Sequence, residues 1–544
     1  MAEVTLVEPA RTRPALADVA DLADVADLAD AASFPVPAPP AAAGETFRIR
    51  SIAAPLAAIV VGTFMAILDT TVVNVALPVL GRVFGADLNL LQWVITGYLL
   101  AQAAVIPLAG WLSDRFGAKR LYITALILFT LGSVLCALAP SGELLVAFRV
   151  LQGLGGGMLM PIGMSFLFRL APPDRRGAVM GAFGVPVLLA PALGPALSGW
   201  LLEFADWRLI FLINAPIGVL AVAAALRTLP VLPELREAGP LDTLGVVLGP
   251  LGFAALSFGI SQSTSAGWTG TTTLAGLVVG AAALAAFVAR ELSVAQPLLE
   301  LRVFRSRDFS LAIATLWALQ AATFGAFFLL PLFLQQVRGY GSFETGLATL
   351  PQALVAATFM PIGGRLFDRV GARPTVIAGL LSAGVALWLL GQVSSATTSA
   401  DLRLPLALMG AGMGLAMMPL NTHVLGSAPR ELVSRVTSLT GAAQNVVVSL
   451  AIAAYATYLQ GQTAAHLAAA GFAATGGPVP AEGAPPASLA QAPAAIQQAL
   501  AAAFGDVYAL ALVAAGVALL LAVALRRPAP AAGAGRATAR AAVA

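Results

Sequence analysis

Long apolar stretches recur along nearly the whole chain, and they limit the possible folds more than any other feature. Each stretch can cross a hydrocarbon layer about 30 Å thick as a helix, the form that satisfies backbone hydrogen bonds within one segment. A mean hydropathy of +0.88 and a charged fraction of 10% agree with this. We therefore predict an all-α polytopic membrane protein with fourteen transmembrane helices. The expected spans are 55–80, 90–113, 119–139, 143–170, 177–201, 207–228, 241–262, 270–290, 309–336, 345–367, 374–394, 403–425, 436–459 and 503–525.

The basic residues test the helix count independently. When the loops are assigned alternately to two sides, one side collects 25 of the 30 Lys and Arg, including both termini. The other side receives Arg82, Arg208, Arg338 and Arg403, and Arg149 lies within a helix. Loops rich in Lys and Arg stay in the cytoplasm. We therefore expect both termini to be cytoplasmic and the protein to reside in the cytoplasmic membrane. The net charge of +3 follows from this topology and indicates no nucleic-acid partner.

An internal repeat divides the chain into two related halves. The pattern Gly-x-x-x-Asp-Arg-x-Gly begins at Gly110 and again 254 positions later at Gly364. Each copy follows one apolar stretch and leads by a short basic turn into the next. The repeat residues singled out here are Gly110, Asp114, Arg115, Gly117 and Arg120 in the first copy and Gly364, Asp368 and Arg369 in the second.

Three segments differ from the apolar stretches. Residues 1–49 contain an Asp at every third position from Asp18 to Asp30 and then a Pro/Ala stretch, which predicts a disordered cytoplasmic tail. Residues 461–502 are rich in Ala, Pro and Gly and predict an external loop, and residues 528–544 predict a second cytoplasmic tail.

No cleavable signal is recognisable. Cys136 is the single cysteine, so neither a disulfide framework nor a thiol metal site is expected.

Two charged residues inside apolar stretches are the strongest candidates for function. Asp69 lies near the middle of the first stretch, where a carboxylate costs several kcal/mol unless it is protonated, paired or facing water. Arg149 lies within the fourth stretch and is its natural partner in charge. We expect the pair to take part in proton coupling. The structural alternatives are an Asp hydrogen-bonded into a helix contact and an Arg that extends to the membrane surface.

The fifth stretch combines prolines with small residues. Prolines inside a helix bend it, and small residues allow close helix packing, so this helix is suited to be a moving contact or simply a tight one. The residues concerned are Gly184, Pro191, Gly194, Pro195 and Gly199.

Over residues 50–527 the chain resembles the major facilitator superfamily, and within it the fourteen-helix branch of drug:proton antiporters. The two Gly-x-x-x-Asp-Arg-x-Gly turns resemble the cytoplasmic gate motif of that superfamily. Asp69 in LDTTVVNVALP resembles the first-helix signature of the branch, and Arg149-x-x-Gln152-Gly153 resembles the motif assigned to proton coupling. The proline-rich fifth helix resembles the antiporter motif. A further resemblance is the segment from Trp207 to Gly218.

The resemblance implies two six-helix bundles that alternate access to a central cavity. Eight helices separate the two gate motifs instead of six, so two helices are inserted between the halves. The expected divisions are an N-terminal bundle at 50–230, two inserted helices with their linkers at 231–308 and a C-terminal bundle at 309–527.

The expected function is proton-coupled efflux of lipophilic neutral or monovalent cationic compounds. Asp69 is the one deep carboxylate, which disfavours divalent cations, and a proton crossing about 100 mV supplies about 2.3 kcal/mol. The repeat residues would latch the cytoplasmic face, as the resemblance implies. Cavity residues expected by their type are Asn74, Trp93, Tyr98 and Gln152, and Trp93 would suit a lipid-facing position equally well.

No enzymatic constellation, cofactor or metal site is predicted, and the energy source would be the proton gradient. Expected partners are small lipophilic substrates, protons and the bilayer, with a periplasmic adaptor protein if the host has an outer membrane. Two alternatives use the same scaffold: proton-coupled uptake of a metabolite, and export of one specific metabolite. A non-transporting scaffold or receptor is a third alternative, which Asp69 disfavours.

Overall fold

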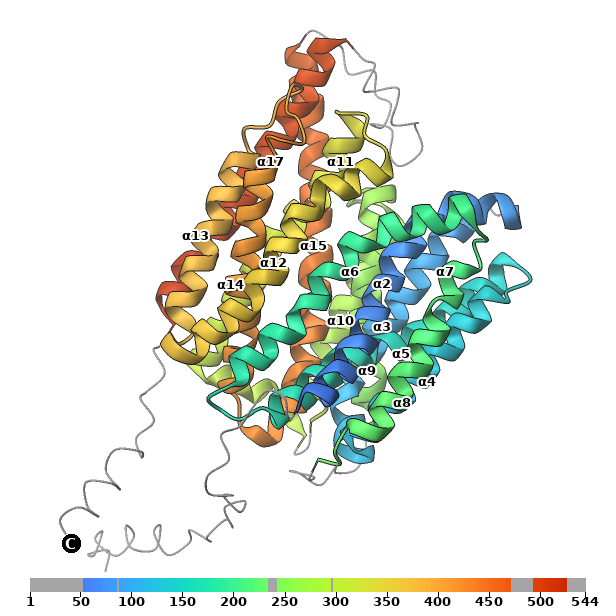
Figure 1. The fold of residues 1–544 in the computed structure, drawn as a ribbon, viewed down its shortest axis with the longest axis vertical. Helices are drawn as coiled ribbons and strands as arrows, with labels where there is room; N and C mark the ends of the chain where they lie inside the picture. The colour runs from blue at the N-terminus through green and yellow to red at the C-terminus, as the bar shows by residue number, and fades with distance from the viewer. Residues whose placement is uncertain (1–51, 86–87, 233–241, 295–296, 471–492, 526–544) are drawn as a thin grey trace, which may run out of the picture. The chain divides into compact units, whose positions relative to one another are not determined.

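The computed structural model describes residues 52–85, 88–232, 242–294, 297–470 and 493–525. These residues form helices joined by short turns (Figure 1). The N-terminal half comprises α2 (Ala53–Phe84), α3 (Leu88–Phe116), α4 (Ala118–Ala137), α5 (Gly142–Leu170), α6 (Arg176–Phe204), α7 (Leu209–Leu212) and α8 (Asn214–Thr228). Next come α9 (Thr243–Ala266) and α10 (Thr271–Ser293). The C-terminal half comprises α11 (Arg307–Gln336), α12 (Ser342–Val370), α13 (Ala372–Leu390), α14 (Arg403–Gly426), α15 (Val433–Ala469) and α17 (Ala494–Val523). Two short 3₁₀ helices, η2 (Leu301–Arg305) and η3 (Arg430–Leu432), precede α11 and α15.

These helices confirm the predicted all-helical membrane fold. Among the described residues, 13 helical segments are long and apolar enough to cross a membrane, with the α7–α8 pair forming one of them. The fourteenth expected span is α6, whose apolar part is recorded over Arg176–Pro191. The fourteen predicted positions thus all correspond to helical segments.

The helices pack in two groups that follow the halves of the sequence. In the first group α5 packs on α3 and α4, and α2 packs on α6 and α8. In the second group α14 packs on α12 and α13, and α17 packs on α11, α13 and α15. The groups meet where α6 lies against α12 (Figure 1). They also meet where α3 lies against α15.

The predicted external loop at 461–502 is too long. The structure continues α15 to Ala469 and starts α17 at Ala494, so both edges of the predicted loop are helical. These edges are rich in alanine, the strongest helix former, and the composition that suggested a loop there equally favours helix. His466 and Asp506 join the two helices near these ends, with 2.8 Å between His466 Nε2 and Asp506 Oδ2.

The predicted tails at 1–49 and 528–544 lie outside the described residues. The linker edges of the predicted bundles also fall partly outside them, so those divisions stay predictions.

Candidate functional site

Asp69 lies on α2 inside the N-terminal helix group, and its carboxylate has three side-chain partners. The residue is 2% exposed. Asp69 Oδ2 lies 2.5 Å from the Arg149 guanidinium on α5. Asp69 Oδ1 accepts hydrogen bonds from the Gln152 amide at 3.0 Å and from the Asn214 amide at 2.9 Å. A buried carboxylate with a charged partner and two amide donors is fully solvated by protein rather than by water.

Arg149 is buried to 1% exposure and has partners besides Asp69. Its guanidinium donates to Gln152 Oε1 at 2.6 Å and to the Val94 carbonyl at 3.3 Å. The guanidinium carbon also lies 3.9 Å from the centre of the Tyr98 ring, a cation–π distance. This arrangement excludes the alternative in which Arg149 extends to the membrane surface.

Neutral polar side chains extend the cluster toward α4 and α8. Asn214 donates to Ser133 Oγ at 3.0 Å, and Ser133 donates to the Phe211 carbonyl at 2.9 Å. Cys136 lies 3.6 Å from Gln152 Oε1. We call Asp69, Arg149, Gln152, Asn214 and Ser133 the polar cluster. It joins α2, α4, α5 and α8.

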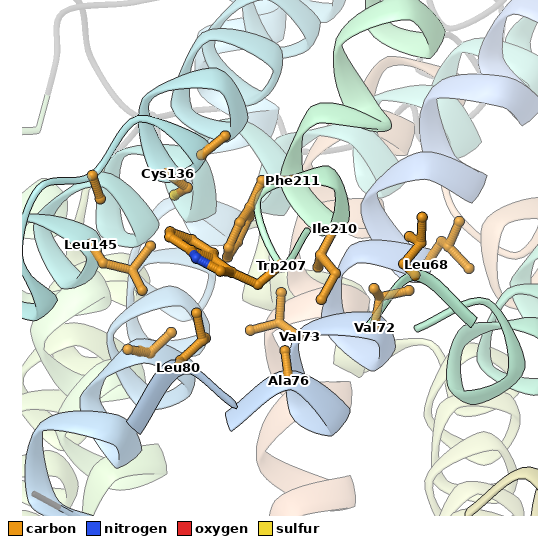
Figure 2. Close-up of a cluster of buried hydrophobic side chains, with 14 of the residues drawn as sticks. Leu68, Val72, Val73, Ala76, Leu80, Cys136, Leu145, Trp207, Ile210 and Phe211 are labelled. Carbon is orange, nitrogen blue, oxygen red and sulfur yellow. The ribbon is translucent and has the colours of Figure 1, made fainter. Parts of the chain in front are cut away.

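Apolar side chains surround one side of the polar cluster. Figure 2 shows residues of α2, including Val72 and Val73, close to Cys136 of α4, to Trp207 in the turn before α7 and to Phe211 of α7. Phe211 and Val73 are fully buried. This packing excludes water, which strengthens the Asp69–Arg149 attraction and raises the cost of leaving either charge unpaired.

The residues expected to line a cavity occupy different surroundings. Gln152 and Tyr98 are buried at 0% and 1% exposure in or against the polar cluster. Trp93 is 45% exposed and stacks on Phe258 of α9, with ring centres 6.0 Å apart. The Asn74 side chain lies outside the described residues. Their role in substrate binding stays a prediction.

The first gate copy meets the C-terminal half through an ion pair. Asp114, at the end of α3, lies 3.2 Å from Arg435 Nε on α15. Gly110 packs on the same helix, since a Cβ there would lie 2.9 Å from the Ser434 carbonyl oxygen. Gly117 follows with φ of +82°, a left-handed conformation that favours glycine. Arg115 and Arg120 are exposed.

The second gate copy meets the N-terminal half through a helix N-terminus. Asp368 on α12 accepts hydrogen bonds from the backbone N–H groups of Gly177 at 2.8 Å and Ala178 at 2.9 Å. These groups open α6, where the helix dipole favours a negative charge. Gly364 faces Gly177 so closely that a Cβ on either residue would collide with the backbone of the other. Arg369 is exposed.

Helix α6 makes the close contacts expected of its small residues, except at one position. A Cβ on Gly184 would lie 2.6 Å from Met418 and 2.7 Å from the Met360 sulfur, and a Cβ on Gly194 would collide with Thr71. Pro191 is half-buried within the helix, and the Pro195 side chain lies outside the described residues. Among the described residues, a Cβ on Gly199 would meet no atom within 4 Å, so packing does not require glycine there.

Residues 59–452 match the sequence model of the Major Facilitator Superfamily. The chain belongs to the major facilitator superfamily. The predicted family is thereby confirmed.

Relatives and solved structures of this superfamily cover most of the chain. It is 36% identical over 411 residues to an uncharacterized MFS-type transporter, YhcA, of Bacillus subtilis, covering 76% of this chain and 77% of YhcA. It is 40% identical over 400 residues to a multidrug resistance protein B homolog of Mycobacterium tuberculosis, covering 72% of this chain and 74% of the relative. The human organic anion transporter MFSD10 shares the fold with a TM-score of 0.56 at 15% identity, over 86% of this chain and 100% of that one. Membership of this superfamily identifies a multi-pass membrane transporter rather than a conventional enzyme.

Sequence reasoning missed two kinds of residue at these sites. Ser133 and Asn214 complete the polar cluster, but uncharged polar residues in an apolar stretch carry little signal by themselves. Asn214 stands in the segment that resembles the branch, so its position was marked without a role. Arg435 directly precedes the expected span 436–459, where a basic residue indicates only a membrane boundary, although it is fully buried and pairs with Asp114.

Proposed function

We propose that this protein exports lipophilic neutral or monovalent cationic compounds in exchange for protons, by alternating access between its two helix groups. The name of one relative, the multidrug export protein EmrB of Haemophilus influenzae, supports efflux as the direction of transport. The basic loops support a cytoplasmic location of both termini and of the gate motifs, in the cytoplasmic membrane.

The observation that carries this proposal is the buried Asp69–Arg149 pair. Asp69 is the deep carboxylate of the N-terminal group, and its Oδ2 atom lies 2.5 Å from Arg149. A proton on this carboxylate would cancel its charge and remove the ion pair, and breaking a buried pair costs about 3–5 kcal/mol. Protonation is therefore an event large enough to shift an equilibrium between two conformations.

Arg149 is equipped to stay in place when Asp69 is neutral. The Gln152 amide oxygen, the Val94 carbonyl and the Tyr98 ring still face its guanidinium. The guanidinium would thus lose one partner and keep three. Protonated Asp69 is no longer attracted to Arg149, while Arg149 is still held by its other partners. We therefore infer that Asp69, and not Arg149, moves relative to α5 after protonation.

The burial of Asp69 bears on the class of substrate. Both carboxylate oxygens are already bonded to Arg149, Gln152 and Asn214, and the residue is 2% exposed. A bulky cation would have to displace Arg149 to contact the carboxylate. We therefore propose that Asp69 acts mainly as a proton switch and that substrates are recognised elsewhere, through apolar contacts that neutral and singly charged compounds share.

The test is efflux of a lipophilic fluorescent cation and of a neutral dye from energised cells. Cells would express the wild type or Asp69→Asn, with and without an uncoupler. We expect uncoupler-sensitive efflux by the wild type and its loss in the variant, with equal amounts of both proteins in the membrane. Unchanged efflux by Asp69→Asn would refute the coupling role. Absence of any dye transport by a well-folded wild type would favour export of one specific metabolite or uptake.

A further inference from the structure

The two inserted helices are packed against both halves of the transporter. Helix α9 lies against α3 of the N-terminal group and against α15 of the C-terminal group. Phe258 of α9 stacks on Trp93 of α3 at 6.0 Å. Trp268, two residues after α9, donates from Nε1 to Thr457 Oγ1 of α15 at 2.6 Å. The hairpin of α9 and α10 is thus in contact with both elements of the α3–α15 seam.

The gate-motif end of this hairpin is tightly fastened. Asp242, just before α9, accepts from Arg290 near the end of α10, with a shortest oxygen–nitrogen distance of 3.1 Å. A Cβ on Gly245 of α9 would lie 3.1 Å from Leu298 and 3.2 Å from Glu291 Oε1. The start of α9, the end of α10 and the turn at Pro297–Leu299 therefore form one packed unit.

Glu291 is the buried acid of that unit. It is 1% exposed on α10, and its Oε2 atom accepts a hydrogen bond from the Leu299 backbone N–H at 2.9 Å. Its Oε1 atom has no hydrogen-bond partner within the described residues. Leu298 and Leu299 are fully buried beside it. Burying a carboxylate costs free energy, and the hydrogen bond from the Leu299 N–H offsets part of that cost. This bond therefore explains why a glutamate occupies the buried position 291.

The turn held by Glu291 contacts the gate directly. The carbonyl of Pro297 accepts a hydrogen bond from the Arg435 guanidinium. The same guanidinium donates from Nε to Asp114 Oδ2 at 3.2 Å. A continuous series of contacts therefore runs from Glu291 through Leu299 and Pro297 to Arg435 and ends at the gate carboxylate. The Pro297 carbonyl has a fixed position only if the turn is fixed.

We propose that Glu291 is a positioning residue of the cytoplasmic gate. It holds the Pro297–Leu299 turn so that the Pro297 carbonyl orients Arg435 toward Asp114. The inserted hairpin is then part of the gate and not merely a spacer between the halves. This inference rests on the proposed alternating access, because only a gate that opens and closes needs a positioned Arg435.

The experiment measures the opening of the α3–α15 seam without any substrate. Ser438 is fully buried on α15 and faces Gly110, since a Cβ on Gly110 would lie 3.1 Å from Ser438 Oγ. Ser438→Cys is nearly isosteric and would be protected from a maleimide while the seam is closed. The purified protein would be labelled in detergent and the rate followed by intact mass. The parent chain, which retains buried Cys136, gives the background rate.

Glu291→Ala should raise the labelling rate of the Ser438→Cys protein about tenfold, because the buried Leu299 N–H would lose its acceptor and the open population would increase. Glu291→Gln should retain nearly the parent rate, because its amide oxygen can accept from the Leu299 N–H. Asp242→Asn is the matched control. Among the described residues Asp242 bonds to Arg290 and makes no hydrogen bond to Pro297 or Leu299, so this change should leave the labelling rate unchanged. Gel filtration would restrict the comparison to monodisperse protein. If Glu291→Ala fails to fold, Glu291→Leu would replace it.

An Arg435→Leu background separates positioning from general loosening. If Glu291 acts through Arg435, Glu291→Ala should add no further increase in that background. An equal tenfold increase with and without Arg435, or no increase with Arg435 present, would overturn the proposal. Labelling requires no transport, so a protein that exports no dye can still be tested in this way. Failure of the proposed function and failure of this inference are therefore distinguishable.

Discussion

The two copies of the gate repeat have the same sequence pattern but different partners. Asp114 pairs with a fully buried arginine of α15, whereas Asp368 accepts two backbone N–H groups at the start of α6. The first contact joins two full charges, and the second joins one charge to a helix terminus. The repeated motif thus places an acid at the seam between the halves, while the facing helix determines how strongly that acid is held.

The largest effect is expected from removing Arg435. Arg435→Leu would remove the ion pair that Asp114 makes with α15, at a cost of about 3–5 kcal/mol. With Ser438→Cys as the reporter, maleimide labelling should accelerate by about two orders of magnitude or more. Adding Asp114→Asn should recover part of the protection, because the charge that Arg435 balanced is then gone. Equal labelling of Arg435→Leu and its parent would show that the ion pair does not hold the seam.

A smaller effect is expected from filling the close approach of the second seam. Gly364→Ala would force its Cβ into the Gly177 backbone, whereas Gly110→Ala meets the Ser434 carbonyl at a less severe distance of 2.9 Å. Overpacking typically costs about 1–3 kcal/mol, and Gly364→Ala should lie at the upper end. The measurement is maleimide labelling of Ala178→Cys, a buried position beside Asp368. A larger effect of Gly110→Ala on its own reporter would reverse the predicted order.

Asp368→Ala should have a weaker effect than Arg435→Leu. It removes an acceptor from two N–H groups of α6, a loss resembling that of a helix cap, at about 1 kcal/mol. Labelling of Ala178→Cys should rise about fivefold. If the helix groups move as rigid bodies, Ser438→Cys should report the same increase. A response confined to one reporter would indicate local fraying instead of gate opening.

The smallest effects are expected from the exposed arginines of the motif. Family resemblance assigns gate roles to Arg115 and Arg369, but both side chains are exposed. Exposed ion pairs contribute about 0–1 kcal/mol. Arg115→Ala and Arg369→Ala should therefore change the labelling rate of either reporter by less than about fivefold. A change as large as that of Arg435→Leu would assign these arginines a direct role at the seam.

The sequence predicted the helices well because each span carries its own apolar signal. Asp69 and Arg149 were recognisable because a charge in an apolar stretch is costly, and the structure brings them to 2.5 Å. Arg435 was not recognisable, since its burial depends on α3 covering the first turn of α15. The Leu299 N–H bond to Glu291 could not be foreseen either, because backbone partners leave no trace in residue types. Sequence therefore identified Asp69, Arg149 and the repeated acids Asp114 and Asp368. Arg435 and the Leu299 N–H are recognised only from the packing of segments distant in sequence.

Transport by reconstituted vesicles would show whether protonation of Asp69 drives export. Wild type and Asp69→Asn would be compared for substrate accumulation driven by an imposed pH gradient and for exchange of labelled against unlabelled substrate without a gradient. The account predicts that Asp69→Asn loses gradient-driven accumulation but retains exchange, because binding and alternation persist while coupling is lost. Accumulation by Asp69→Asn at the rate of the wild type would contradict it.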